Sequence, residues 1–374
     1  PAPNIGQRNG GVRRPAPNIA GRGRETRAEH RGHSQQEKGR SMLRTPCRTA
    51  ASRATRGLTL IEVIVTVLIL VTLFALLAPA VRRPGCGRRP ECQNNMRQLT
   101  LAMMNYASRE NGQLPWLVSG DPGQHDRNWL VDLLPDLDQA AIHRSWHEMT
   151  PLARDRFDWP HLKALTCPQD SRKFQDSGPK LSYVVNGGYG LFTTDRKTHA
   201  VTEVGTHSPG NFDWDGDGRV TGVDERIGAA TGIFWRQHST TFQSSLDFIA
   251  NGDGQSNTIL LTENLNAGNW NSFELLDIAF VAGIERMRFR QPPKSKAVLG
   301  LKSADLGPFG VQAGRVPGRS PSPSSNHDGV VIMGFADGSA KQISTKIDPL
   351  IYLRLMTPDG QRFGQAVIGD ELVK

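Results

Sequence analysis

The sequence predicts an α+β fold with an N-terminal transmembrane helix, a second amphipathic helix, and an antiparallel β-sheet globular domain. Three observations lead to this prediction. Residues 58–81 form a continuous apolar run, residues 92–106 carry apolar side chains at helical spacing, and short strand-like runs follow residue 115. The predicted parts are a leader (1–57), the transmembrane helix (58–81), a Pro- and Gly-rich break (82–90) and the globular domain (91–374).

The formal net charge of +9 is concentrated at the N-terminus. Residues 1–57 contain 13 Lys and Arg against three Glu, whereas the other 317 residues contain 32 basic and 33 acidic side chains. A nucleic-acid-binding domain needs a basic face on its folded part. Because the remainder of the chain is nearly neutral, we expect no nucleic-acid partner.

Residues 1–41 are rich in Arg, Gly and Pro, contain PAPNI twice and lack apolar periodicity. A segment of this composition cannot bury enough apolar surface to fold. Two interpretations stay open. Either translation starts at Met42, the first methionine, or the segment is a disordered basic extension.

The apolar run at residues 58–81 reads LTLIEVIVTVLILVTLFALLAPAV, and Glu62 is its one charged residue. As a helix rising about 1.5 Å per residue it would span about 36 Å, more than the ~30 Å core of a bilayer. Arg48, Arg53 and Arg56 precede the run, so the leader is expected to stay cytoplasmic. We therefore expect a single-pass inner-membrane protein whose C-terminal domain is periplasmic or at the cell surface.

The residues around Gly57 make this interpretation more specific. A signal-peptide cleavage site follows its apolar segment, whereas the sequence GLTLIE at residues 57–62 stands at the start of the run. It closely resembles the G-F-T-L-I-E motif of type IV prepilins, with Leu58 in place of Phe. The resemblance implies cleavage after Gly57 by prepilin peptidase and methylation of the new N-terminus at Leu58. It also implies that Glu62 pairs with the N-terminal ammonium of a neighbouring subunit; the alternative is a carboxylate without a partner.

A second helix is predicted after the break. The Pro- and Gly-rich segment should end or kink the first helix between Arg82 and Pro90, because proline removes a helix donor and clashes with the preceding turn. The second helix should begin near Glu91 and end by the Asn111–Gly112 turn. Its apolar stripe consists of Cys92, Met96, Leu99, Met103 and Tyr106.

Beyond residue 115 the pattern is typical of one antiparallel sheet packed against the second helix. Loops are expected at Pro151, at 176–180 and at 316–326. The clearest strand-like runs are Leu181–Val185, Thr258–Thr262, Ala279–Val281, Gly329–Phe335 and Ser339–Ser344. Trp116, Trp129, Trp146 and Trp159 are expected to be core or interface aromatics.

Several segments of this domain resemble a prepilin-like family of planctomycete bacteria that carries a C-terminal domain of unknown function ending in a His-x9-Asp-Gly signature. The signature residues here are His327, Asp337 and Gly338. The resemblance implies a structural pseudopilin-like subunit that assembles with other pilin-like subunits. The matching segments are CQNNMRQLTLAMMNYAS (92–108), CPQD (167–170), LSYVVNGG (181–188), GIFWR (232–236), NGDGQSNTILLTEN (251–264) and SSNHDGVVIMGFADGSAKQIS (324–344).

An oxygen-rich loop at residues 213–224 predicts a structural calcium site. It follows the EF-hand-type pattern D-x-D-x-D-G, with Asp in place of Glu at the twelfth position. The alternative is an Asp- and Gly-rich turn without an ion. We expect the loop to lie in an insertion near residues 211–226. The predicted ligands are Asp213, Asp215, Asp217, Arg219 (through its carbonyl), Thr221 and Asp224.

The sequence predicts no catalytic residues. The His327/Asp337 pair is expected to fix a hairpin, with Asp337-Gly338 at its turn, rather than to act as an acid and a base. Glu263, after an apolar strand, is a candidate buried acid with a structural partner. Cys86, Cys92 and Cys167 could supply one disulfide, with the pairing left open, and their spacing fits no four-ligand zinc pattern.

Three functions follow as hypotheses. The first is a structural, non-enzymatic pseudopilin-like subunit in a type II secretion or pilus-like system, with the membrane, prepilin peptidase and other pilin-like subunits as partners. The second is a surface binding module for a glycan or a protein, exported by the prepilin route. The third is a tethered hydrolase, which requires an exposed His327.

Overall fold

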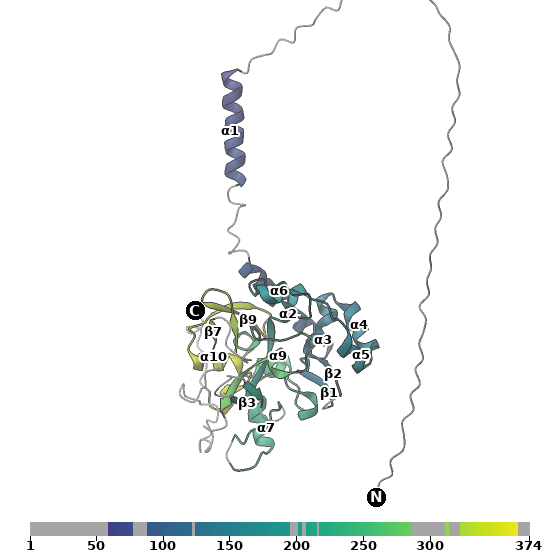
Figure 1. Cartoon of the computed structure of the whole chain (residues 1–374). Coiled ribbons are helices and arrows are strands. Elements are labelled where there is room, and N and C mark those ends of the chain that lie inside the picture. The colour runs from purple at the N-terminus through teal and green to yellow at the C-terminus, as the bar shows by residue number, and fades with distance from the viewer. Residues whose placement is uncertain are drawn as a thin grey trace, which may run out of the picture. The chain divides into compact units, whose positions relative to one another are not determined.

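The computed structural model describes residues 59–77, 88–121, 124–194, 201–203, 207–214, 217–285, 311–313 and 322–365. The chain divides into two compact units, Pro1–Leu70 and Val71–Lys374. Figure 1 shows the first helix, α1, and the remaining described elements, which form an α+β domain. Each is described by itself.

Helix α1 covers Leu60–Leu77. The Thr66 hydroxyl is satisfied within the helix, since it donates to the carbonyls of Glu62 and Val63 at 3.0 and 2.9 Å. Glu62 lies in the first turn, where the helix dipole favours a negative charge. Large apolar side chains cover every side of the helix and are 45–81% exposed from Leu60 to Phe74.

The predicted transmembrane helix at 58–81 is wrong. Within the described ranges no helix is both long and apolar enough to cross a membrane. The described helix α1 has 18 residues, which at about 1.5 Å per residue gives about 27 Å, less than the ~30 Å hydrocarbon core. The single-pass inner-membrane localisation, which depended on that helix, is overturned with it.

Helix α2 covers Arg88–Arg109, three residues earlier than its predicted start. Cys92, Met96, Leu99 and Met103 are fully buried, as their spacing predicts. The helix ends where Asn111 and Gly112 adopt positive φ and the Gly112 amide donates to Ala107. Its buried stripe packs on strands β5, β9 and β10.

A mixed six-stranded sheet forms the centre of the domain. The order is β10-β9-β5-β3-β4, and β6 pairs with β3 outside this path. The pairs along the path are antiparallel, but β6 runs parallel to β3, so the predicted all-antiparallel sheet is wrong. The strands are β3 (Tyr183–Thr194), β4 (Val201–Glu203), β5 (Ile259–Glu263), β6 (Ala279–Glu285), β9 (Val330–Phe335) and β10 (Ala340–Ser344).

Close packing between α2 and the sheet depends on Gly334 of β9. A Cβ at this position would lie 2.4 Å from the Thr100 side chain and 3.1 Å from the Met96 sulfur. The helix therefore rests directly on the strand backbone. This contact fixes Cys92, one turn before Met96, against the same face of the sheet.

The remaining elements are short and surround this core (Figure 1). Pro151, predicted in a loop, instead opens a helix capped by the Thr150 side chain, a position where proline loses no hydrogen bond. Trp129, Trp146 and Trp159 are buried. These elements are β1 (Val118–Asp121), β2 (Gln124–Asn128), α3 (Trp129–Leu133), η2 (Leu134–Leu137), α4 (Ala140–Glu148), α5 (Pro151–Arg156), η3 (Lys163–Leu165), α6 (Ser171–Phe174), α7 (Gly222–Ala229), η4 (Gln237–Ser239), α8 (Leu246–Asn251), η5 (Gln255–Asn257), α9 (Leu275–Ile278), β7 (Gln312–Ala313), β8 (Ser324–Ser325), α10 (Pro349–Met356) and η7 (Gly360–Phe363).

Candidate functional site

Four side chains from distant segments meet in the interior of the domain, and we call them the buried centre: Cys92, Cys167, Glu263 and His327. Cys92 lies on α2, Cys167 in the turn before α6, Glu263 at the end of β5, and His327 between β8 and β9. Cys92 and Cys167 form a disulfide that joins α2 to this turn. One candidate ligand atom from each of the four residues lies within 4.8 Å of the others.

The polar groups of the buried centre are joined by hydrogen bonds. His327 Nε2 lies 3.0 Å from Glu263 Oε1 and 3.6 Å from Cys167 Sγ. The second carboxylate oxygen of Glu263 accepts the Ile332 amide at 2.9 Å. Burial, and next the charge of Glu263, raise the pKa of Tyr183 well above its ordinary value. The hydrogen bonds of Glu263 to His327 and to the Ile332 amide offset the cost of burying its carboxylate.

His327 and Asp337 do not pair with each other. His327 is 3% exposed and uses Glu263 as its carboxylate partner. Asp337 is exposed, and its Oδ1 accepts the Ser339 amide at 2.9 Å in the turn between β9 and β10, where Gly338 has φ 82°. A hydrolase that uses an exposed His327 therefore lacks the geometry that it requires.

The acidic loop, residues 213–224, is closed by its own side chains. Asp213 accepts the Gly218 amide at 2.9 Å, and Asp217 accepts the Arg219 amide at 2.7 Å. Asp224 is fully buried and accepts the Trp214 amide at 2.6 Å, which joins the two ends of the loop.

The second half of the acidic loop also starts a helix. The Asp224 carboxylate accepts the Thr221 amide at 2.8 Å, and the Thr221 side chain caps α7 in a reciprocal capping box. Asp215 lies outside the described residues. The described part of the loop thus offers carboxylates at both ends and only oxygen ligands, which is the chemistry that calcium prefers.

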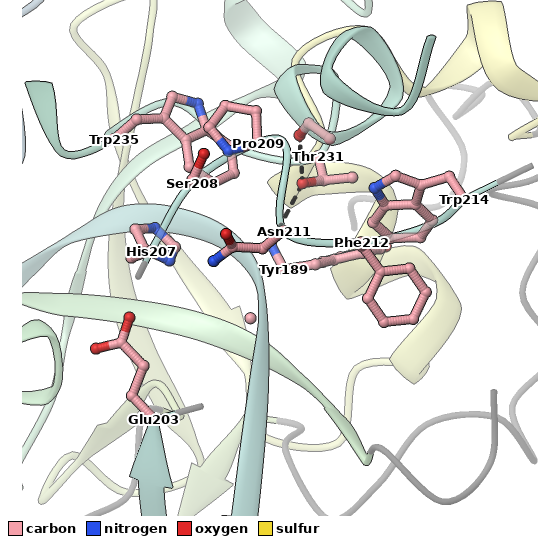
Figure 2. Close-up of a pocket in the computed structure, with 12 residues that line it drawn as sticks. Tyr189, Glu203, His207, Ser208, Pro209, Asn211, Phe212, Trp214, Thr231 and Trp235 are labelled. Atoms are coloured by element: carbon pink, nitrogen blue, oxygen red, sulfur yellow. Dashed lines mark hydrogen bonds between the residues drawn. The ribbon is translucent and has the colours of Figure 1, made fainter. Parts of the chain in front are cut away.

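A small pocket adjoins the acidic loop (Figure 2). It encloses about 20 Å³, enough for about one water molecule. His207 stacks on Trp235, with ring centroids 4.9 Å apart, and Glu203 lies beside them. The pocket is lined by Tyr189, Gly190, Glu203, His207, Ser208, Pro209, Asn211, Phe212, Trp214, Gly228, Thr231 and Trp235.

Glu203 and His207, which line the pocket, both have shifted pKa values. Burial raises the pKa of Glu203 to about 7, although the Arg236 guanidinium, 3.9 Å away, lowers it. Burial, and next the positive charge of Arg236, lower the pKa of His207 to about 3. The ring of His207 is therefore neutral at physiological pH, and Glu203 changes its charge there.

Several polar atoms of the pocket have no hydrogen-bond partner among the described residues. Buried polar groups are almost always paired with protein or water, so such a cluster is unusual. The atoms are Tyr189 Oη, Glu203 Oε1, His207 Nε2, Trp214 Nε1 and Trp235 Nε1.

Residues 86–278, just over half of the chain, match the model of a family described as "Protein of unknown function (DUF1559)". The chain belongs to this family. Three members of the buried centre lie within the DUF1559 match, whereas His327 lies beyond it. The match includes neither the prepilin-like motif at 57–62 nor the His-x9-Asp-Gly signature. No curated protein and no solved structure matches the chain.

Sequence reasoning found some of these site residues and missed others. Gly57 and Leu58 lie outside the described residues, whereas Glu62 lies in the first turn of α1. The pocket residues Glu203 and His207 were not predicted, because an isolated acid and an isolated histidine carry no spacing signal. The buried centre was missed as a set because its members are separated by 60 residues or more along the chain.

Proposed function

We propose that this DUF1559 protein is a structural, pseudopilin-like subunit that assembles with its copies or with other pilin-like subunits through helix α1. Prepilin peptidase would cut after Gly57 and methylate Leu58, so that α1 begins at the mature N-terminus. The subunit would belong to a type II secretion or pilus-like assembly. The DUF1559 family is often found in prepilin-like proteins, which supports this assignment.

The observation that carries the proposal is the exposed apolar surface of α1. Twelve large apolar side chains between Leu60 and Phe74 are at least 45% exposed. Burying one such side chain completely is worth roughly 1.5–3 kcal/mol, and a helix that is apolar on all sides is stable only when it is covered. Packing against the α1 helices of other subunits would cover it.

Glu62 is the residue that would set the register of this packing. After cleavage, its carboxylate lies one helical turn from the new N-terminus at Leu58. An ammonium group from a neighbouring subunit would compensate the carboxylate when α1 becomes buried. Each charge would otherwise be costly to remove from water.

The test is cross-linking between tagged and untagged copies in cells that contain a prepilin peptidase. Glu62→Ala should reduce the copy-to-copy cross-links by about a hundredfold or more, because breaking a buried ion pair costs roughly 3–5 kcal/mol. Glu148→Ala, which removes an exposed acid of the domain, is the matched control and should have no effect. Mass spectrometry should show that both variants are still processed. Full cross-linking of processed Glu62→Ala would contradict the proposal.

We also propose that the acidic loop binds one structural calcium ion. Its ligands would be Asp213, Asp215, Asp217, the Arg219 carbonyl, Thr221 and Asp224. The hydrogen bonds that close the loop between Trp214 and Asp224 support this proposal, because they hold the acids of both ends in one turn. Calcium would compensate carboxylates that otherwise repel one another.

A further inference from the structure

The buried centre contains a complete set of zinc-type ligands. Two cysteine sulfurs, one imidazole nitrogen and one carboxylate oxygen lie within 4.8 Å of one another, and all four residues are buried. In tetrahedral zinc sites, Zn–S is ~2.3 Å and Zn–N or Zn–O ~2.0–2.2 Å, so ligand atoms lie roughly 3.3–3.8 Å apart. The His327–Glu263 and His327–Cys167 distances of 3.0 and 3.6 Å are already close to this range.

We propose that the buried centre binds one zinc ion when the Cys92–Cys167 disulfide is reduced. The ligands are the sulfurs of Cys92 and Cys167, Nε2 of His327 and a carboxylate oxygen of Glu263. The disulfide and the zinc ion are alternative ways to close the same site, since a disulfide sulfur is no longer a thiolate. With four protein ligands and no exposed position, the site is structural rather than catalytic.

The change from disulfide to zinc site is chemically balanced with a phosphine as the reductant. The phosphine breaks the S–S bond and takes up the oxygen of one water molecule to become a phosphine oxide. The two hydrogens of that water protonate the two cysteine sulfurs. Zinc binding then releases these thiol protons, because the thiolate is the form that coordinates the metal.

The backbone needs little adjustment for a zinc ion to replace the disulfide. The Cα atoms of Cys92 and Cys167 lie 5.3 Å apart, and rotation about the Cα–Cβ bonds separates the sulfurs without moving α2. His327 contacts the other members of the centre through Nε2, the nitrogen that would bind zinc. Glu263 keeps one oxygen on the Ile332 amide and uses the other as a ligand.

The experiment uses the full chain, reduced with a phosphine under anaerobic conditions and kept in excess calcium to occupy the acidic loop. Zinc is added, the unbound metal is removed by gel filtration, and the metal content is measured by mass spectrometry. Circular dichroism checks that the reduced chain is folded. We expect one zinc per folded, reduced chain, none in the oxidised chain, and release of the zinc on reoxidation with a small-molecule disulfide, which is itself reduced to two thiols. A folded, reduced chain that retains no zinc would overturn the proposal, as would equal retention by the oxidised chain.

Variants identify the ligands. Glu263→Gln keeps the acceptor for the Ile332 amide and His327→Asn keeps a polar side chain, and each should weaken zinc binding at least about tenfold. Cys47→Ser and Cys86→Ser change cysteines outside the centre and should retain zinc fully. Cobalt provides a second readout, because thiolate ligation gives an intense sulfur-to-cobalt absorption. Loss of the metal in the Cys47 or Cys86 variants, or an unchanged affinity in both ligand variants, would contradict the assignment.

Discussion

Helix α1 and the domain that begins with α2 differ in whether their apolar side chains are exposed or buried. In α1 the large apolar side chains from Leu60 to Phe74 are exposed, whereas in α2 the apolar stripe from Cys92 to Met103 is fully buried against the sheet. The domain therefore has its own core, and α1 has none. From this difference we infer that α1 acts through a partner and that the stability of the domain does not depend on it.

This difference predicts that variants of the two regions affect different properties. Changes in the buried centre, the pocket and the acidic loop should alter the free energy of unfolding of the domain and leave cross-linking through α1 unchanged. Changes in α1 should do the reverse. Cross-linking is measured for each variant below beside its stability, and a variant that alters both properties would break the separation between the two regions.

The largest effect is expected from loss of the disulfide. Cys92 and Cys167 are 75 residues apart in the chain, and closing a loop of this length stabilises a fold by about 4.5 kcal/mol in the chain-entropy model. The double variant Cys92→Ser/Cys167→Ser should lower the free energy of unfolding by about this amount. Urea titrations measure it, in the presence of a chelator that excludes zinc. Cys47→Ser, the control, should leave it unchanged, and a loss under about 1 kcal/mol in the double variant would contradict the prediction.

Removal of the His327 ring should cause the second-largest loss of stability. His327→Ala leaves the buried Glu263 carboxylate without its side-chain hydrogen-bond partner, and leaving a buried charged group unpaired in this way costs about 3 kcal/mol or more. Asp337→Ala removes one hydrogen bond in an exposed turn and should cost only about 0.5–1 kcal/mol. Equal losses in the two variants, measured by urea unfolding, would show that the buried centre does not stabilise the domain.

Glu203 should make the domain less stable as the pH rises. Its pKa of about 7 lies above the ordinary 4.5, so the folded state binds more protons and stability falls between pH 4.5 and pH 7. His207 has the opposite effect on stability. Its pKa is about 3 in the folded state against the ordinary 6.5, so the unfolded state binds more protons and stability rises between pH 3 and pH 6.5. Since both proteins contain His207, the difference between wild type and Glu203→Gln isolates Glu203.

That difference should reach about 2 kcal/mol at pH 7, after allowance for the partial exposure of the Glu203 carboxyl. The variant should be the more stable protein at pH 7, and the two should converge near pH 4.5. Urea unfolding at several pH values measures the effect. Parallel curves for the two proteins would contradict the assigned pKa shift.

Calcium removal should have the smallest effect. A ligand present at ten times its Kd stabilises the folded state by about 1.4 kcal/mol, and a chelator should remove this contribution. Asp213→Asn should show a reduced response to the chelator, whereas Asp155→Asn, an exposed acid outside the loop, should respond like the wild type. An unchanged melting temperature of the wild-type chain in chelator would count against a structural ion.

Local patterns in the sequence predicted the features that depend on near neighbours in the chain. The spacing of Cys92, Met96, Leu99 and Met103 predicted the buried stripe of α2, and Asn111-Gly112 predicted its end. The β9 and β10 hairpin follows from two strand-like runs on either side of Asp337-Gly338. These features need only periodicity and turn chemistry.

Features that depend on the tertiary structure were not predicted. The parallel pairing of β6 with β3 joins segments that the sequence leaves independent, and the pairing partner of Cys92 stayed open until both cysteines were placed. Glu263 was expected to have a structural partner, but its pairing with His327 requires the register of β5 against β9. The apolar composition of residues 58–81 predicted a transmembrane helix, but no helix among the described residues is long and apolar enough to cross a membrane.

The most direct test of the proposed function is the N-terminal sequence of the protein purified from cells that produce it naturally. Cleavage after Gly57 would make a methylated Leu58 the first residue and place Glu62 as the fifth, ready to pair in a neighbouring subunit. Our account predicts this terminus. An unmodified terminus upstream of Gly57, or one downstream of α1, would contradict it.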